Sequence, residues 1–99
     1  METQYLPAFI KDLKSLKSSS SYWSIRKLVF EEIPSSQDIR DIKNVKKLRA
    51  EDTAYRIRVG DYRIGFFVED GNKIIFARIL HRRESVSYTH LRAHETKAN

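Results

Sequence analysis

Ninety-nine residues are enough for one small domain with a single hydrophobic core, and 40% hydrophobic with 32% charged residues is a composition typical of folded chains. The absence of cysteine excludes disulfides, thiolate metal sites and a cysteine nucleophile, while the lack of a membrane-length apolar run and of a signal peptide predicts a cytoplasmic protein that enters no membrane. Lys and Arg outnumber Asp and Glu by 19 to 13, and the net charge of +6 favours a polyanionic partner, with nucleic acid as the first candidate.

The first half of the chain carries helical periodicity. A strand is expected over Thr3 to Leu6, before Pro7, which suits the first turn of a helix because that turn needs no N–H from it. Apolar residues then recur at intervals of three and four, which predicts a helix from Pro7 to Lys17. The serine run from Ser18 to Ser21 is typical of a turn that supplies an N-cap to the next helix.

A second helix begins at Tyr22, and its apolar residues again follow helical spacing. The segment Pro34 to Ser36 ends it, so the two helices form a hairpin. Tyr22 and Trp23 stand at its start, and we expect them to pack in the core rather than to stack on a base. The connector from Gln37 to Arg49 has an apolar residue about every three positions, which fits a helix, a loop or a short turn.

The second half changes to the two-residue alternation of strands. Alternating segments cover Ala54 to Val59, Tyr62 to Val68 and Lys73 to Leu80, and Gly60-Asp61 and Asp70-Gly71 mark two-residue turns between them. The pattern predicts a three-stranded antiparallel meander. Together with the N-terminal strand and the two-helix hairpin, it defines an α+β fold in which the helices pack on one face of the sheet.

The two turns decide which residues face each other. The first places Arg58 opposite Arg63 and Arg56 opposite Gly65, and the second, counted in the same way, places Arg78 opposite Arg63. Like charges directly opposite one another destabilise a sheet unless solvent screens them or an anion binds. The four arginines therefore form either a solvated face or a phosphate-binding surface. Gly65 favours the second, because a position without a side chain allows a ligand to approach closely.

Three strings resemble the RelE/ParE toxin superfamily, on its RelE-like side: FIKDLKSL near the start, YRIRVGDYRI in the hairpin and HRRE after the last strand. The resemblance implies the fold described above and a toxin of a type II toxin–antitoxin system. RelE-like members cleave messenger RNA in the ribosomal A site without a metal or other cofactor. The resemblance therefore also implies mRNA, the ribosome and a cognate antitoxin as partners, and a toxin–antitoxin complex on operator DNA.

Two alternatives to this enzyme remain open. One is a ParE-like inhibitor of DNA gyrase, which shares the fold and needs no catalytic residues. The other is a basic binding module that has no activity. The sequence does not separate these functions, because all three classes fit a basic α+β domain of this size.

The resemblance also assigns roles to basic residues. The family's charge-stabilising positions correspond to Arg58, Arg63 and Arg83, and guanidinium groups suit this role because they stay protonated and make poor general bases. His81 is a candidate acid or base, and its alternative role is to close the last strand and position Arg83. Further RNA contacts are expected from Arg56, Arg78, Arg82, Lys46 and Lys47, although the two lysines also fit a solvated loop.

After Glu84 the sequence shows neither the alternation of a strand nor the apolar spacing of a helix. VSYTHLRAHET resembles the conceptual translation of a sequencing-library adaptor, which predicts a toxin domain over residues 1–84 and a disordered, non-native tail over residues 85–99. His90 and His94 are therefore not interpreted as a metal site. Relatives carry a tyrosine shortly after the HRRE glutamate, where this chain has Val86 and Ser87, so we expect it to fold and to cleave RNA weakly or not at all.

Overall fold

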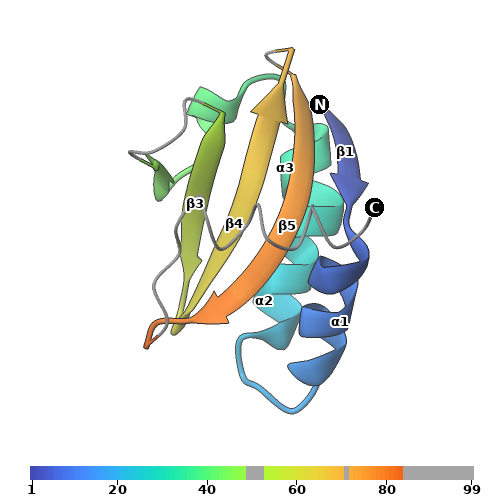
Figure 1. The fold of residues 1–99 in the computed structure, drawn as a ribbon, viewed down its shortest axis with the longest axis vertical. Helices are drawn as coiled ribbons and strands as arrows, with labels where there is room; N and C mark the ends of the chain where they lie inside the picture. The colour runs from blue at the N-terminus through green and yellow to red at the C-terminus, as the bar shows by residue number, and fades with distance from the viewer. Residues whose placement is uncertain (49–52, 71, 84–99) are drawn as a thin grey trace.

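Five strands form a single sheet (Figure 1). The computed structural model describes residues 1–48, 53–70 and 72–83. The strands are β1 (Glu2–Tyr5), β2 (Val45–Lys47), β3 (Ala54–Val59), β4 (Tyr62–Glu69) and β5 (Lys73–His81). Their order is β1-β5-β4-β3-β2, with β1 parallel to β5 and the other neighbours antiparallel. The predicted N-terminal strand and meander are confirmed, and β2 is an additional strand at the edge.

The helical segments cover one face of this sheet, behind the strands in Figure 1. They are α1 (Pro7–Ser15), α2 (Tyr22–Lys27), the π-helical turn η1 (Leu28–Glu32) and α3 (Ile33–Ser35). The N–H of Ile33 donates to the carbonyl of Leu28, in the pattern of a π-helix. Helical geometry then continues across Pro34 and ends at Ser35. The predicted hairpin of two helical runs and its α+β layering are confirmed.

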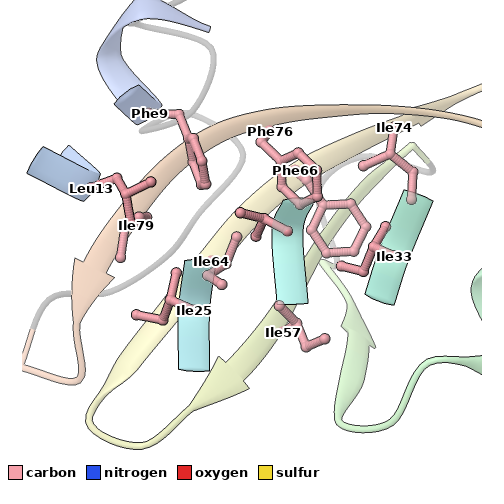
Figure 2. Close-up of a cluster of buried hydrophobic side chains, with 11 residues drawn as sticks. Phe9, Leu13, Ile25, Ile33, Ile57, Ile64, Phe66, Ile74, Phe76 and Ile79 are labelled. Carbon is pink, nitrogen blue, oxygen red and sulfur yellow. The ribbon is translucent and has the colours of Figure 1, made fainter. Parts of the chain in front are cut away.

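The core fills the space between the helices and the sheet (Figure 2). Phe9 and Leu13 of α1 and Ile25 of α2 are buried, at spacings that place side chains on one helix face. Alternate strand residues complete the cluster: Ile57, Ile64, Phe66, Ile74, Phe76 and Ile79. Because side chains alternate across a strand, the residues between these belong to the opposite face of the sheet. That opposite face carries the arginines of β3 and β4.

Trp23 does not join the core. Its side chain is 71% exposed, whereas Tyr22 is half-buried against the core, and the two rings meet edge to face with centroids 5.1 Å apart. The prediction that both residues pack inside is wrong for Trp23. The reason is helical geometry: Ile25 points inward, and a residue two positions earlier lies about 200° around the axis, on the solvent side.

The connector contains the 3-10 turn η2 (Ile39–Asp41) and the strand β2, which the apolar spacing did not distinguish from a helix or a loop. Asp38 caps η2, because its Oδ1 accepts a hydrogen bond from the Arg40 N–H at 2.8 Å. The hydrogen bond from the Arg40 side chain, assisted by this backbone bond, lowers the pKa of Asp38. Asn44 then adopts a φ of 65°, which turns the chain into β2.

The pairing of β4 with β5 departs from the prediction. Glu69 pairs with Lys73, so the turn is one residue longer than the predicted two. A β-bulge next to Gly65 shifts the register by one more residue, and Gly65 pairs with Arg78. The longer turn and the bulge each shift the pairing by one residue, so together they keep Arg78 on the predicted face of the sheet. Its partner on β4 becomes Gly65 instead of Arg63. The prediction that Arg78 lies opposite Arg63 is therefore wrong.

No helix among the described residues is long and apolar enough to cross a membrane. The predicted non-native tail, residues 85–99, and its two histidines lie outside the described residues. Glu84, the predicted end of the toxin domain, also lies outside them.

Candidate functional site

The hairpin of β3 and β4 brings two arginines face to face. Arg58 pairs with Arg63 and Arg56 pairs with Gly65, so the register predicted for this hairpin is confirmed. Gly60 makes the turn with a φ of 57°, and a glycine with positive φ at the first central position is what a type II′ turn requires. The turn chemistry thus sets the alignment of the two guanidinium groups on the face that the helices leave uncovered.

β2 extends this charged face toward the sheet edge. Lys46 pairs with Arg56, so its side chain shares the face of the arginines, whereas Lys47 pairs with Tyr55 and belongs to the opposite face. A groove of about 650 Å³ runs along this edge; its lining residues are Asn44, Val45, Lys46, Arg56, Arg58 and Gly60. We call it the basic groove. Its charged side chains are all cationic.

The positive charges of the basic groove have no acidic counterpart within the described ranges. No ion pair there joins a carboxylate to Lys46, Arg56, Arg58 or the neighbouring Arg63. Arg58 is exposed, and Arg56 and Arg63 are half-buried. Cations held this close on a sheet repel one another, and a bound anion relieves the repulsion. The geometry is therefore suited to a polyanion that lies across β3 and its two neighbours.

Arg78 has a different environment. Its Nε donates to Oδ2 of Asp12 on α1 at 2.6 Å, and the same carboxylate accepts the backbone N–H of Ile79 at 2.9 Å. The side chains of Arg78 and Asp12 are only 16% and 19% exposed. The pair fixes α1 to β5 and commits the Arg78 guanidinium to a carboxylate. The sequence interpretation missed Asp12, whose one visible signal was an acidic residue in a lysine-rich helix.

The end of β5 folds back onto the β3–β4 turn. Arg63 Nη1 donates to the carbonyl of Arg82 at 3.0 Å, and the Arg82 N–H donates to the carbonyl of Asp61 at 2.6 Å. Arg82 also forms an exposed ion pair with the Asp61 carboxylate at 3.7 Å. These contacts bring Arg83, the next residue, to the end of the sheet where Arg58 and Arg63 lie. The structure thus groups the three predicted catalytic arginines at one end of the hairpin.

His81 is the last residue of β5. Its Nδ1 accepts the backbone N–H of Arg83 at 3.2 Å, and its ring meets Tyr62 edge to face with centroids 5.4 Å apart. The contact ties the imidazole to the backbone of the residue that follows the end of the strand. The contact is the one that the positioning role of His81 requires.

The chemistry available here is that of permanent positive charge and one imidazole. Guanidinium groups can bind phosphate oxygens and stabilise charge that develops on them, and they make poor bases at neutral pH. Within the part of the chain that the structure describes, no group of three His, Cys, Asp or Glu could hold a metal ion. The residues therefore favour charge stabilisation of a phosphate as their common task.

Known proteins with similar sequence or structure point to one family. A family model described as the ParE toxin of the type II toxin–antitoxin system parDE matches residues 4–86. Toxin RelE3 of Methanocaldococcus jannaschii is 40% identical over 92 residues, which are 89% of this chain and 98% of that protein. The RelE chain in the RelB–RelE antitoxin–toxin complex from Methanococcus jannaschii is 38% identical, with a TM-score of 0.66 over 81% of this chain and 91% of that one.

A more distant relative shares the fold. A mutant of Escherichia coli toxin RelE in the free state is 18% identical, with a TM-score of 0.62 over 98% of this chain and 95% of that chain. The match to the family model and the 40% identity extend over most of the sequence, including the hairpin that carries the arginines. The chain therefore belongs to the RelE/ParE superfamily and is a RelE-like toxin of the type II toxin–antitoxin class.

Proposed function

We propose that this toxin cleaves messenger RNA in the A site of the ribosome, without a metal or other cofactor. The observation that supports the proposal best is the direct pairing of Arg58 with Arg63, beside Lys46 and Arg56, with no carboxylate paired to them in the described ranges. RNA supplies the anion that this face requires, because each nucleotide carries a phosphate. We assign the activity to residues 1–84, which contain all of these side chains.

The cleavage step uses the RNA's own 2′-hydroxyl. The hydroxyl loses a proton, its oxygen bonds to the adjacent phosphorus, and the bond to the 5′-oxygen breaks. Arg58, Arg63 and Arg83 stabilise the negative charge that grows on the phosphate oxygens during this step. The 5′-oxygen must gain a proton as it leaves, and His81 is the candidate group for proton transfer or for the placement of Arg83.

The remaining basic residues hold the RNA backbone. Lys46 and Arg56 line the basic groove, and Arg82 is exposed just after β5, next to Arg83. We assign phosphate contacts to all three. Arg78 and Lys47 make weaker candidates for RNA contacts. Arg78 is paired with Asp12, and Lys47 belongs to the face that the helices cover.

The toxin acts together with an antitoxin that neutralises it. Support comes from solved relatives: the structure from Methanococcus jannaschii and one from Pyrococcus horikoshii are both RelE–RelB complexes, with 38% and 24% identity to this chain. The cognate antitoxin is expected to be encoded beside the toxin gene, and the pair is expected to bind operator DNA. Growth arrest on expression of the toxin, rescued by the neighbouring gene, tests this partnership.

Ribosomes programmed with a defined mRNA test the enzymatic activity. We expect cuts at A-site codons, weaker with this chain than with Ser87→Tyr, mapped by primer extension. The cut ends should carry a 5′-hydroxyl because the 5′-oxygen is the leaving group. Arg58→Ala should remove the cuts, whereas Lys27→Ala, which changes an exposed residue of α2, should not. Ser87→Tyr is tested in parallel, since relatives carry a tyrosine near this position. Intact mRNA with both the parent chain and Ser87→Tyr would contradict the proposal.

A supercoiling assay separates this activity from that of a gyrase inhibitor. The match to a ParE family model justifies the comparison. We expect purified DNA gyrase to supercoil plasmid at the same rate with and without the toxin. Inhibition of gyrase together with uncut mRNA would assign the ParE-like function instead.

A further inference from the structure

Trp23 is the one large apolar side chain that is exposed among the described residues, with 71% of its surface open to solvent. The half-buried Tyr22 meets it edge to face, at an angle of 80° between the two ring planes. The indole is therefore held against the protein on one side and is free on the other. A large ring that is supported in this way suits contact with a second aromatic ring.

The helices around Trp23 carry an excess of positive charge. Residues 7–27, which form α1, α2 and the turn between them, contain five Lys or Arg side chains and one carboxylate, that of Asp12. Asp12 is paired with Arg78 of β5, and within the described ranges no ion pair joins a carboxylate to any of the five cations. An anionic partner is therefore favoured on this side of the molecule.

Arg26 lies on the side of α2 that is turned toward α1. Ser24 lines a groove whose opposite wall is β3, and Arg26 is about 200° further round the helix axis, on the side where Figure 1 shows α1. Its guanidinium carbon is held 5.3 Å from the centroid of the Phe30 ring. Two more exposed cations stand in the last turn of α1 and just after it. Together with the indole these cations form what we call the helical patch: Lys14, Lys17, Trp23 and Arg26.

The helical patch lies near the candidate site but faces another direction. A Cβ at Gly60, in the turn after β3, would lie 2.6 Å from Oγ of Ser21, two positions before Trp23. The turn before α2 thus touches the end of the hairpin where Arg58 and Arg63 pair. The arginines belong to the open face of the sheet, whereas α2 covers the other face (Figure 1). A strand bound across the arginines therefore does not pass over Trp23, and a second strand is needed to reach it.

We propose that Trp23 stacks on an unpaired base of ribosomal RNA, while the cations of the helical patch contact the phosphates beside that base. This inference rests on the proposed function, which places the toxin in the A site, where ribosomal RNA surrounds the message. Stacking of a base on an aromatic side chain, combined with contacts of Lys or Arg to the backbone, is how proteins hold unpaired RNA. The message then occupies the open face, and the helical patch holds the toxin on the ribosome.

Binding to vacant ribosomes, which carry no message, tests the helical patch separately from cleavage. Trp23→Leu keeps an apolar side chain but removes the aromatic face, and Trp23→Phe is the matched control that keeps that face. We expect Trp23→Leu to weaken binding by about 5- to 150-fold, the range that corresponds to the loss of one stacked base, and Trp23→Phe to stay within about threefold of the parent. Urea unfolding should show both variants as stable as the parent, because the position is exposed.

The salt dependence of binding gives a second, independent readout. Lys17→Ala should reduce the slope of log affinity against log salt concentration by about 0.7, the value for one lost phosphate contact to a single strand. Trp23→Leu should leave this slope unchanged, because stacking releases no counterions.

Three results would contradict the inference. Ribosomes that bind the parent and Trp23→Leu equally would overturn it and leave the proposed cleavage intact; a purely apolar contact with a ribosomal protein would give this result. Equal losses in Trp23→Leu and Trp23→Phe would overturn the stacking. A parent chain and a Ser87→Tyr variant that neither bind ribosomes nor cut mRNA would overturn the inference together with the proposed function.

Discussion

Arg58 and Arg63 face each other directly across β3 and β4, on the side of the sheet opposite the helices. No carboxylate in the described ranges pairs with either one. Two like charges in this position weaken the sheet, so their presence needs a functional reason. An anion that binds between them relieves the repulsion, so the RNA binding proposed for this face would be linked to the stability of the free protein.

Arg58→Ala should therefore change activity and stability in opposite directions. We expect mRNA cleavage to fall by about 10² or more, because a charge that stabilises the transition state is lost. The free energy of unfolding should stay the same or rise by about 0.2–1 kcal/mol, because a like-charge pair is removed. Cleavage assays and urea unfolding measure the two quantities, with Lys27→Ala as the control. A clear loss of stability on removal of Arg58 would contradict this account of the pair.

The register of this hairpin was predictable because it depends on local chemistry. Gly60 and Asp61 form a turn of defined length, and the alternation of the flanking strands then places every pair. The same counting failed beyond Asp70, whose positive φ of 53° belongs to a longer turn, and again at the bulge beside Gly65. Both features depend on packing between strands and the helices, which a single sequence does not reveal.

The residues of the candidate site fall into the same two groups: those that follow from local sequence and those that depend on packing. The grouping of Arg56, Arg58 and Arg63 follows from a two-residue period and was predicted. The addition of Lys46 required β2, a strand of three residues whose formation depends on its pairing with β3. The ion pair of Arg78 with Asp12 joins residues 66 positions apart in the sequence, and only the packing of α1 against β5 brings them together.

Asp12→Asn should destabilise the fold strongly, although it replaces only one carboxylate oxygen by an amide nitrogen. It removes the charge that pairs with a mostly buried Arg78 and weakens the bond to the Ile79 N–H. We expect a loss of about 2–3 kcal/mol in the free energy of unfolding, since the Arg78 guanidinium loses a charged partner at a place where both side chains are mostly buried. Urea unfolding measures this loss.

Glu2→Gln is the natural control for this variant. The ion pair of Glu2 with Lys73 spans 4.0 Å, and the Glu2 side chain is 72% exposed. Its removal should cost less than about 1 kcal/mol, as for most surface pairs. Equal losses in Asp12→Asn and Glu2→Gln would show that the contact of Asp12 with β5 does not stabilise the fold.

Gly60→Ala should lower stability for two separable reasons. The φ of 57° disfavours any side chain, and a Cβ at this position would lie 2.6 Å from Oγ of Ser21. We expect a loss of about 1–3 kcal/mol. In the double variant with Ser21→Ala the hydroxyl is gone, so the stability lost through the clash should be recovered. The loss caused by the positive φ should remain. A double-mutant cycle in urea measures this coupling, and strict additivity of the two losses would contradict it.

Asp38 should contribute to stability in a manner that depends on pH. Its pKa is lowered by the hydrogen bond from the Arg40 side chain and by the bond from the Arg40 N–H. A carboxyl group whose pKa is depressed by folding stabilises the native state above its unfolded-state pKa, about 3.9, and loses that contribution as the pH falls through the folded value. The difference in stability between the parent and Asp38→Asn should therefore shrink below about pH 4. Urea unfolding of both proteins across that range measures it, and a difference that is independent of pH would refute the link.

The role of His81 can be decided by two substitutions that differ in one property. Asn carries an oxygen near the position of the imidazole Nδ1 and can accept the Arg83 N–H, but it does not transfer protons near neutral pH. Leu can do neither. If His81 positions Arg83, as the 3.2 Å hydrogen bond indicates, His81→Asn should retain mRNA cleavage within about tenfold, and His81→Leu should lose about 10² or more. If His81 instead transfers the proton, both variants should lose activity equally, and the dependence of the cleavage rate on pH should lose its imidazole step. We expect the first outcome, because the Nδ1 lone pair is already occupied by the backbone of the residue it would position.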